Sequence, residues 1–138
     1  MSTLVASTVK TNTIQNTSGA SSSTADQLNQ GRAKVWCSFN GVTPAIKDSF
    51  NVSSLTDNGT GNYDVNFSSN MSNNNYAVSL TTGDGTFGSQ IPYGLFFTLG
   101  GYSQTSSVTN SSVRVYQISY AGGVYDALHN HVVVFGDT

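Results

Sequence analysis

The sequence predicts an all-β protein: a β-sandwich or jelly-roll-like domain that follows an extended N-terminal arm. Helix formers are scarce, because Glu is absent and Lys and Arg together number only five. Seven Phe, seven Tyr and one Trp favour strands, and 14 Gly with abundant Asn and Ser favour turns. From Ala33 onward apolar residues recur at period two, with no helical pattern between the expected strands.

Residues 1–32 form the predicted arm. Val5, Val9 and Ile14 are isolated there in polar sequence, and a low-complexity Ser-rich run follows them. Such a segment buries too little apolar surface to fold alone, so we expect a sister subunit or a neighbouring protein to order it. Val5, Val9 and Ile14 are therefore the candidate docking residues. The one helical stretch expected is Ser23–Gly31, one or two turns long, with Ser23 or Thr24 as its N-cap.

Residues 33–138 form the predicted knob domain, and its first strand runs from Ala33 to Phe39. Val35, Cys37 and Phe39 share one face of this strand, and Trp36 lies on the other. Cys37, the only cysteine, is expected to be a small buried hydrophobe. Asn40-Gly41 then predicts a turn.

The clearest hairpin is predicted around residues 57–61, whose Asp, Asn and Gly tolerate positive φ. Its flanks are Ile46–Leu55, with Phe50 and Val52 in phase, and Tyr63–Phe67. Tyr63, Val65 and Phe67 should face the core, and Asp64 and Asn66 the solvent.

The remaining elements are expected in a simple order. They are a turn at Asn73–Asn75 before Tyr76, a loop at Gly83–Gly94, strands at Leu95–Leu99 and Val113–Ile118, a turn at Ala121–Gly123, and a last strand at Leu128–Phe135. Because Leu95–Leu99 is apolar on both faces, we expect it to be buried once in the core and once between subunits, which favours a homotrimer.

Four segments resemble the distal domain of tail-fibre-like proteins of marine phages, notably cyanophages. The most specific are Gly31–Gly41 (GRAKVWCSFNG) and Ile46–Gly61 (IKDSFNVSSLTDNGTG). The polar lead Thr11–Gly19 is similar to the segment that often precedes that domain, and the end of the chain, with VRV and then VVVFG, is similar to its last strands. The middle, residues 81–110, carries no specific likeness.

This resemblance implies a homotrimeric virion structural protein on a tail fibre, a tail tip or a capsid appendage. Its expected partners are further copies of itself, other tail or capsid proteins of the virion, and a glycan or receptor on the host surface. Long fibres carry a large shaft, whereas only residues 1–32 precede the domain here. That difference favours a short host-attachment fibre or knob, or alternatively a capsid decoration or head fibre protein with a purely structural role.

His129 and His131 are the candidate metal ligands. Two positions apart on a strand, they share one face, which Val133 and Phe135 continue. In a trimer, the pairs from all subunits could surround one iron ion, an arrangement that resembles intertwined phage fibres. The alternative is a pair of interface histidines that hydrogen-bond to neighbours, and no cofactor is otherwise expected.

Phe87, Tyr93 and Tyr102 are the candidate receptor or glycan contacts. Their rings could stack on sugars, while nearby Asn, Ser and Thr bond hydroxyls. The alternative is that these aromatic residues fill the core or subunit contacts.

Several functions are expected to be absent. The five candidate acids Asp48, Asp57, Asp64, Asp84 and Asp126 lack a Glu partner, and no nucleophile-elbow motif occurs, so no enzyme is expected. The net charge of −2 argues against nucleic acid. No signal peptide or membrane-length apolar run is recognised, so we expect a virion protein that is made in the host cytoplasm.

Overall fold

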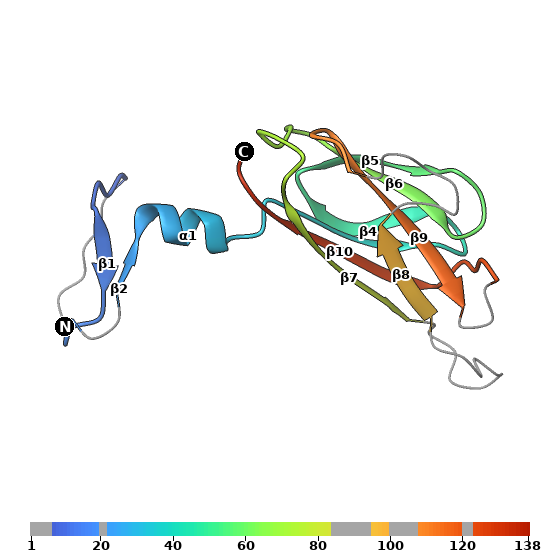
Figure 1. The fold of residues 1–138 in the computed structure, drawn as a ribbon, viewed down its shortest axis with the longest axis horizontal. Coiled ribbons are helices and arrows are strands. Elements are labelled where there is room, and N and C mark those ends of the chain that lie inside the picture. Colours follow the sequence, from blue (N-terminus) through green and yellow to red (C-terminus); the bar gives the residue numbers. More distant parts are fainter. Residues whose placement is uncertain (1–6, 20–21, 84–94, 100–107, 120–122) are drawn as a thin grey trace. The chain divides into compact units, whose positions relative to one another are not determined.

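The computed structural model describes residues 7–19, 22–83, 95–99, 108–119 and 123–138. It divides the chain into two compact units, Met1–Arg32 and Ala33–Thr138, each considered by itself (Figure 1). In both units together, the described residues are mostly in strands, which confirms the all-β class. None of the described helices has the length and apolarity required to cross a membrane.

The described part of the smaller unit contains a two-stranded sheet and one helix. Strands β1 (Thr13–Gln15) and β2 (Ser22–Thr24) pair antiparallel, and α1 (Ala25–Gly31) follows at once. The Gln27 amide donates to Thr24 Oγ1 at 3.1 Å, and the Thr24 amide donates to Gln27 Oε1 at 2.9 Å. This reciprocal capping box confirms the predicted helix and selects Thr24 as its cap.

Within its described residues, the larger unit contains two four-stranded sheets in which all pairs are antiparallel. The first has the spatial order β4 (Ala45–Phe50), β3 (Val35–Asn40), β10 (His129–Phe135) and β7 (Ala77–Gly83). The second has the order β5 (Val52–Asp57), β6 (Asn62–Phe67), β9 (Ser112–Ser119) and β8 (Leu95–Leu99). The predicted turns at 40–41, 57–61 and 73–75 all connect strands as expected.

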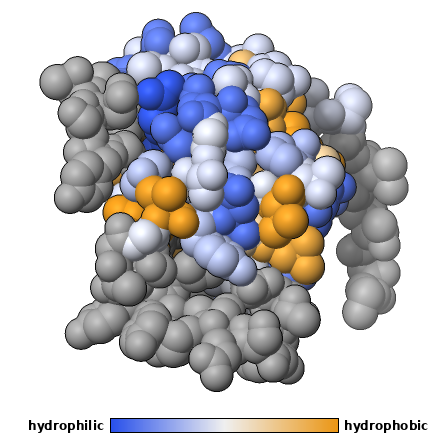
Figure 2. All heavy atoms as spheres, turned by 90° about the vertical axis from the view of Figure 1, so that its right-hand side faces the viewer, coloured by the Kyte–Doolittle hydropathy of each residue, from blue (hydrophilic) through white to orange (hydrophobic). Residues whose placement is uncertain are grey.

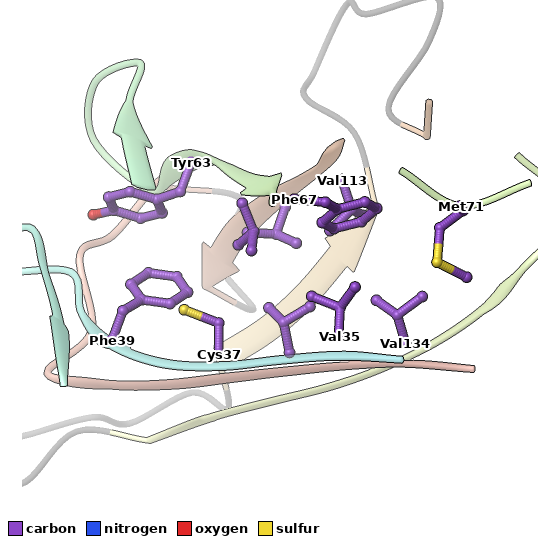
Figure 3. Packing of buried hydrophobic residues seen from close by; sticks show 11 residues of the cluster. Val35, Cys37, Phe39, Tyr63, Phe67, Met71, Val113 and Val134 are labelled. Carbon is purple, nitrogen blue, oxygen red and sulfur yellow. The ribbon is translucent and has the colours of Figure 1, made fainter. Parts of the chain in front are cut away.

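The core lies where the buried side chains of the two sheets point toward one another (Figure 3). Phe39 of β3 meets Tyr63 of β6, with ring centroids 5.1 Å apart. The alternation predicted for β3, β6 and β9 is confirmed, and Cys37 is buried as expected. Where the structure describes side chains, the fully or nearly buried apolar residues are Val35, Cys37, Phe39, Tyr63, Val65, Phe67, Met71, Val113, Val115, Ala127, Val132 and Val134.

The predicted continuous flank Ile46–Leu55 is wrong, because Asn51 divides it into β4 and β5. Asn51 has φ 56°, a left-handed conformation that Asn tolerates better than most residues. Its side chain accepts from the Ser69 amide at 2.7 Å and donates to the carbonyls of Lys34 and Ser69 at 3.2 and 3.1 Å. The chain therefore changes sheet at this residue.

A register shift between Ser38 and Phe39 changes which residues of β4 face outward. Ile46 pairs with Phe39 and packs against the core, whereas Phe50 pairs with Trp36 on the outer face and is 52% exposed. Phe50 and Val52 therefore do not continue one apolar face, contrary to expectation.

A buried hydrogen-bonded group, which the sequence did not indicate, links the sheets. Gln117 in β9 and Asn130 in β10 are both fully buried, and the Gln117 side-chain amide donates to Asn130 Oδ1. Asn130 Oδ1 also accepts from Thr82 Oγ1 at 2.8 Å. The Ala127 amide donates to Gln117 Oε1, and Asn130 Nδ2 donates to the Ala127 carbonyl, both at 2.9 Å. The side chains of Gln117 and Asn130 thus have hydrogen-bond partners inside the core.

β8 lies at an edge of its sheet, where the structure pairs it with β9. Leu99 is 43% exposed. The side chains of residues 95–97 lie outside the described set, so the expected double burial of this strand stays a prediction. The expected loop at 83–94 and the expected turn at 121–123 also fall almost entirely outside it. On the side shown in Figure 2, most of the described surface is hydrophilic, with small, separate hydrophobic patches.

Candidate functional site

The first candidate site is the outer face of the β4-β3-β10-β7 sheet, which carries the histidine pair. His129 and His131 are exposed, and Asn130 between them is buried, so the two rings share one face of β10 as predicted. Val133, half-buried, and Phe135, exposed, continue that face. The prediction that these four side chains share a face is confirmed.

The surroundings of His129 restrict its chemistry. Lys47 Nζ lies 2.9 Å from His129 Nδ1 and donates to the Leu128 carbonyl at 2.7 Å. An ammonium group can only donate, so Nδ1 of His129 is the acceptor in this contact. A metal ligand needs a nitrogen lone pair, and the lone pair on Nδ1 of His129 is engaged by Lys47.

His129 therefore has a hydrogen-bonding neighbour of the kind that the alternative to a metal site requires. Among the residues that the structure describes, no group of three or more His, Cys, Asp or Glu side chains could hold a metal ion. Iron bound by pairs from several subunits stays a prediction, because it depends on side chains of other copies.

Two parallel rows of side chains cross this outer face beside the histidines. One row is apolar and consists of Phe50, Trp36 and Val133, which lie directly opposite one another on three adjacent strands. The next row is polar and consists of Asp48, Ser38, His131 and Thr81. The sequence placed Trp36 on this face, but Phe50 joins it because of the register shift in β4.

The second candidate site is a groove of about 370 Å³ on the smaller unit. Its lining consists of Val9, Thr11, Ile14, Ala25, Leu28, Asn29 and Arg32. The structure thus brings together Val9 and Ile14, two of the predicted docking residues, while Val5 lies outside the described residues. Sequence reasoning missed Ala25 and Leu28, although their spacing of three within a helix would have placed them on one face.

Val9, Ile14 and Leu28 are 63, 54 and 47% exposed, so the groove leaves considerable apolar surface in contact with solvent. Arg32 is the one ionic side chain in its lining. Exposed apolar side chains that converge on a groove are typical of contact sites for another chain.

The predicted glycan contacts Phe87, Tyr93 and Tyr102 all lie outside the described residues. Their role stays a prediction, and the structure says nothing of their neighbours.

The candidate acids that the structure describes have structural partners. Asp64 accepts from Arg114 Nε at 2.5 Å and Nη2 at 2.7 Å, and this hydrogen-bonded pair lowers the pKa of Asp64. Asp57 accepts from the Gly59 amide at 2.8 Å within its turn. Asp48 accepts from the amide of the next residue, Ser49, at 2.8 Å.

Asp126 forms part of a corner between loops. Its Oδ1 accepts from the Gly61 amide at 2.6 Å and from the Tyr63 hydroxyl, which also lies 3.0 Å from the Gly41 carbonyl oxygen. Burial, and then the hydrogen bond to Asp126, raises the pKa of Tyr63. The Tyr63–Asp126 contact therefore fastens the loop before β10 to the turns after β3 and β5.

The chain was compared with protein family models, with curated proteins and with solved structures, and none of them matches it. The case for a function therefore rests on the residues and surfaces described above.

Proposed function

We propose that this chain is a phage virion structural protein, a short tail-fibre, tail-tip or knob module that mediates host attachment. In this proposal the two facing sheets form a β-sandwich knob, three copies assemble into a homotrimer, and the smaller unit docks onto the particle. The protein is located in the virion, binds surfaces and catalyses no reaction.

The observation that carries the proposal is the apolar groove of the smaller unit. This unit is small and separate, yet Val9, Ile14 and Leu28 are largely exposed in one groove. Burying a Val, Ile or Leu side chain contributes roughly 1.5–3 kcal/mol, so leaving three exposed forgoes a sizeable stabilisation. A docking arm accounts for that arrangement, because another virion protein would cover the groove with its own apolar side chains.

The resemblance of Gly31–Gly41 and Ile46–Gly61 to distal tail-fibre domains supports the same reading. These segments form β3, β4, β5 and the turns beside them, so the resemblance falls on the framework of the larger unit. The partners found for Asp57, Asp64 and Asp126 also favour a binding protein, because each carboxylate is engaged in holding the fold.

The position on the particle tests this proposal. We expect gold-labelled antibody against the chain to decorate the tails of intact phage particles. Labelling confined to the shell would favour the alternative, a capsid decoration or head fibre protein. Absence from purified particles would overturn both.

Docking through the groove is tested in the full-length chain. Substituting Val9, Ile14 and Leu28 together by Ser should abolish incorporation into particles, while the larger unit keeps its thermal transition. A matched control, Val42→Ser with Val124→Ser, removes similarly exposed apolar side chains from the larger unit and should leave incorporation unchanged. Normal incorporation of the triple variant would contradict a docking role for the groove.

Assembly is tested by sedimentation equilibrium at micromolar concentration. We expect three times the monomer mass of 14.5 kDa, about 44 kDa. A monomer under these conditions would overturn the homotrimer.

A further inference from the structure

The outer face of the β4-β3-β10-β7 sheet has a composition that differs from an ordinary solvated sheet face. Phe50, Trp36 and Val133 lie side by side across three strands, about 4.8 Å apart from strand to strand. Phe50 is 52% exposed, and Trp36 and Val133 are partly exposed. Two aromatic side chains and one valine, each at least partly exposed, therefore form a strip across three strands of this face.

Hydrogen-bonding side chains flank this strip. Two residues further along the strands, about 6.7 Å away, Asp48, Ser38, His131 and Thr81 form the polar row. Asp48, His131 and Thr81 are exposed and Ser38 is half-buried. The row offers a carboxylate, an imidazole and two hydroxyls, and so both donors and acceptors.

We propose that this face binds a neutral pyranose glycan, with a sugar ring stacked on Trp36 and Phe50. A pyranose has one face of C–H groups with slight positive charge, which suits the negative face of an aromatic ring. Hydroxyls project from its rim and would bond to Asp48, Ser38 and His131. The proposal rests on the attachment function proposed above and names the chemistry that this function would recognise.

The size and charge of the face favour a glycan over other occupants. A stable contact with a second copy would bury about 800 Å² on each partner, with an apolar centre, whereas this strip is three side chains wide and bordered by polar residues. Nucleic acid requires cations that face its phosphates. Lys47 of β4 has its ammonium group engaged by Leu128 and His129.

A glycan array tests the proposal with the full-length protein. The array should carry neutral gluco-, galacto- and manno-oligosaccharides of two to six rings, and we expect binding to a subset of them. The affinity for the best array sugar should fall about tenfold or more for Phe50→Ser and for Trp36→Ala. Phe50→Ser is the variant less prone to unfold the protein, because the Phe50 side chain is half exposed and its loss leaves the core intact.

Val124→Ser is the matched control. Val124 is comparably exposed, at 44%, but bridges to Ile118 of the other sheet. This variant should bind the array sugar like the parent. His131→Ala should weaken binding without changing which sugars are bound, since it removes a hydrogen bond and leaves the aromatic strip.

Failure of this proposal can be told apart from failure of the attachment function. If the chain labels phage tails but no array sugar binds, or if Phe50→Ser binds like the parent, this site is wrong and the virion role stands. If a sugar binds and substitution of Trp36 or Phe50 weakens that binding, but purified particles lack the chain, the glycan site is supported and the virion role is wrong. Protection of this face by a second copy in solution, seen by hydrogen exchange, would also overturn the glycan site.

Discussion

Gln117 and Asn130 form a hydrogen bond inside the core that joins β9 of one sheet to β10 of the other. Each also bonds the backbone of Ala127, so the pair holds the segment that leads into β10. A buried amide that loses its partner retains the full cost of desolvation, whereas a satisfied network specifies one arrangement. The relative placement of the two sheets should therefore depend on these two residues.

Replacing either Gln117 or Asn130 by Leu should lower the free energy of unfolding by about 2 kcal/mol, because each substitution strands a buried polar partner. The double variant should be less destabilised than the sum of the two single variants. Urea unfolding followed by tryptophan fluorescence measures this. Asn74→Leu, at an exposed turn, should change the value by no more than about 0.5 kcal/mol. Additive single effects would show that the pair is not coupled.

Gly41→Ala should destabilise the larger unit by about 1–3 kcal/mol, because there is no space for a methyl group. An added Cβ would lie 2.7 Å from the Ala127 carbonyl oxygen and 2.9 Å from the Tyr63 hydroxyl. Gly83→Ala is the control, since no described heavy atom lies within 4 Å of its added Cβ. The midpoint of urea unfolding compares the two variants. Equal midpoints would mean that the corner around Gly41 is looser than described.

The Asp64–Arg114 pair should make stability depend on pH in the acid range. The hydrogen bonds from Arg114 hold the pKa of Asp64 below its ordinary value of 3.8. Because the folded-state pKa is the lower one, the pair stabilises the protein above about pH 4 and this contribution disappears as the pH falls through the folded pKa. Asp64→Asn should cost about 1 kcal/mol at pH 7 and flatten the acid limb of the stability profile. If the variant loses unfolding free energy at low pH as steeply as the parent does, groups other than Asp64 cause the acid sensitivity.

Cys37 should be inert to thiol reagents in the folded protein. Its side chain is 2% exposed, and desolvation raises the pKa of the thiol to about 11. Only the thiolate reacts, so at pH 8 the rate with a disulfide reagent should be about a hundredfold or more below that of the denatured chain. Stopped-flow absorbance provides both rates. Fast modification in native buffer would place Cys37 at the surface.

Much of the fold follows from local sequence. Period-two alternation assigned Val35, Cys37 and Phe39 to the core, and did the same for Tyr63, Val65 and Phe67. The Asn- and Gly-rich runs marked the turns, because these residues accept backbone conformations that others avoid. Thr24, three residues before Gln27, was identified as a possible cap on the same local grounds. Such features depend only on a residue and its near neighbours in the chain.

The candidate surfaces depended on tertiary structure. Alternation identifies residues that share a face, but it does not indicate where a strand leaves one sheet for the other. The left-handed backbone at Asn51 and the register shift beside Phe39 decided that question, and together they placed Phe50 next to Trp36. Gln117 and Asn130 likewise looked like ordinary polar positions, because their partners lie on different sheets. By itself the sequence determined the buried faces of β3, β6 and β9, whereas pairing between distant segments decided where β4 ends and β5 begins and which outward side chains meet.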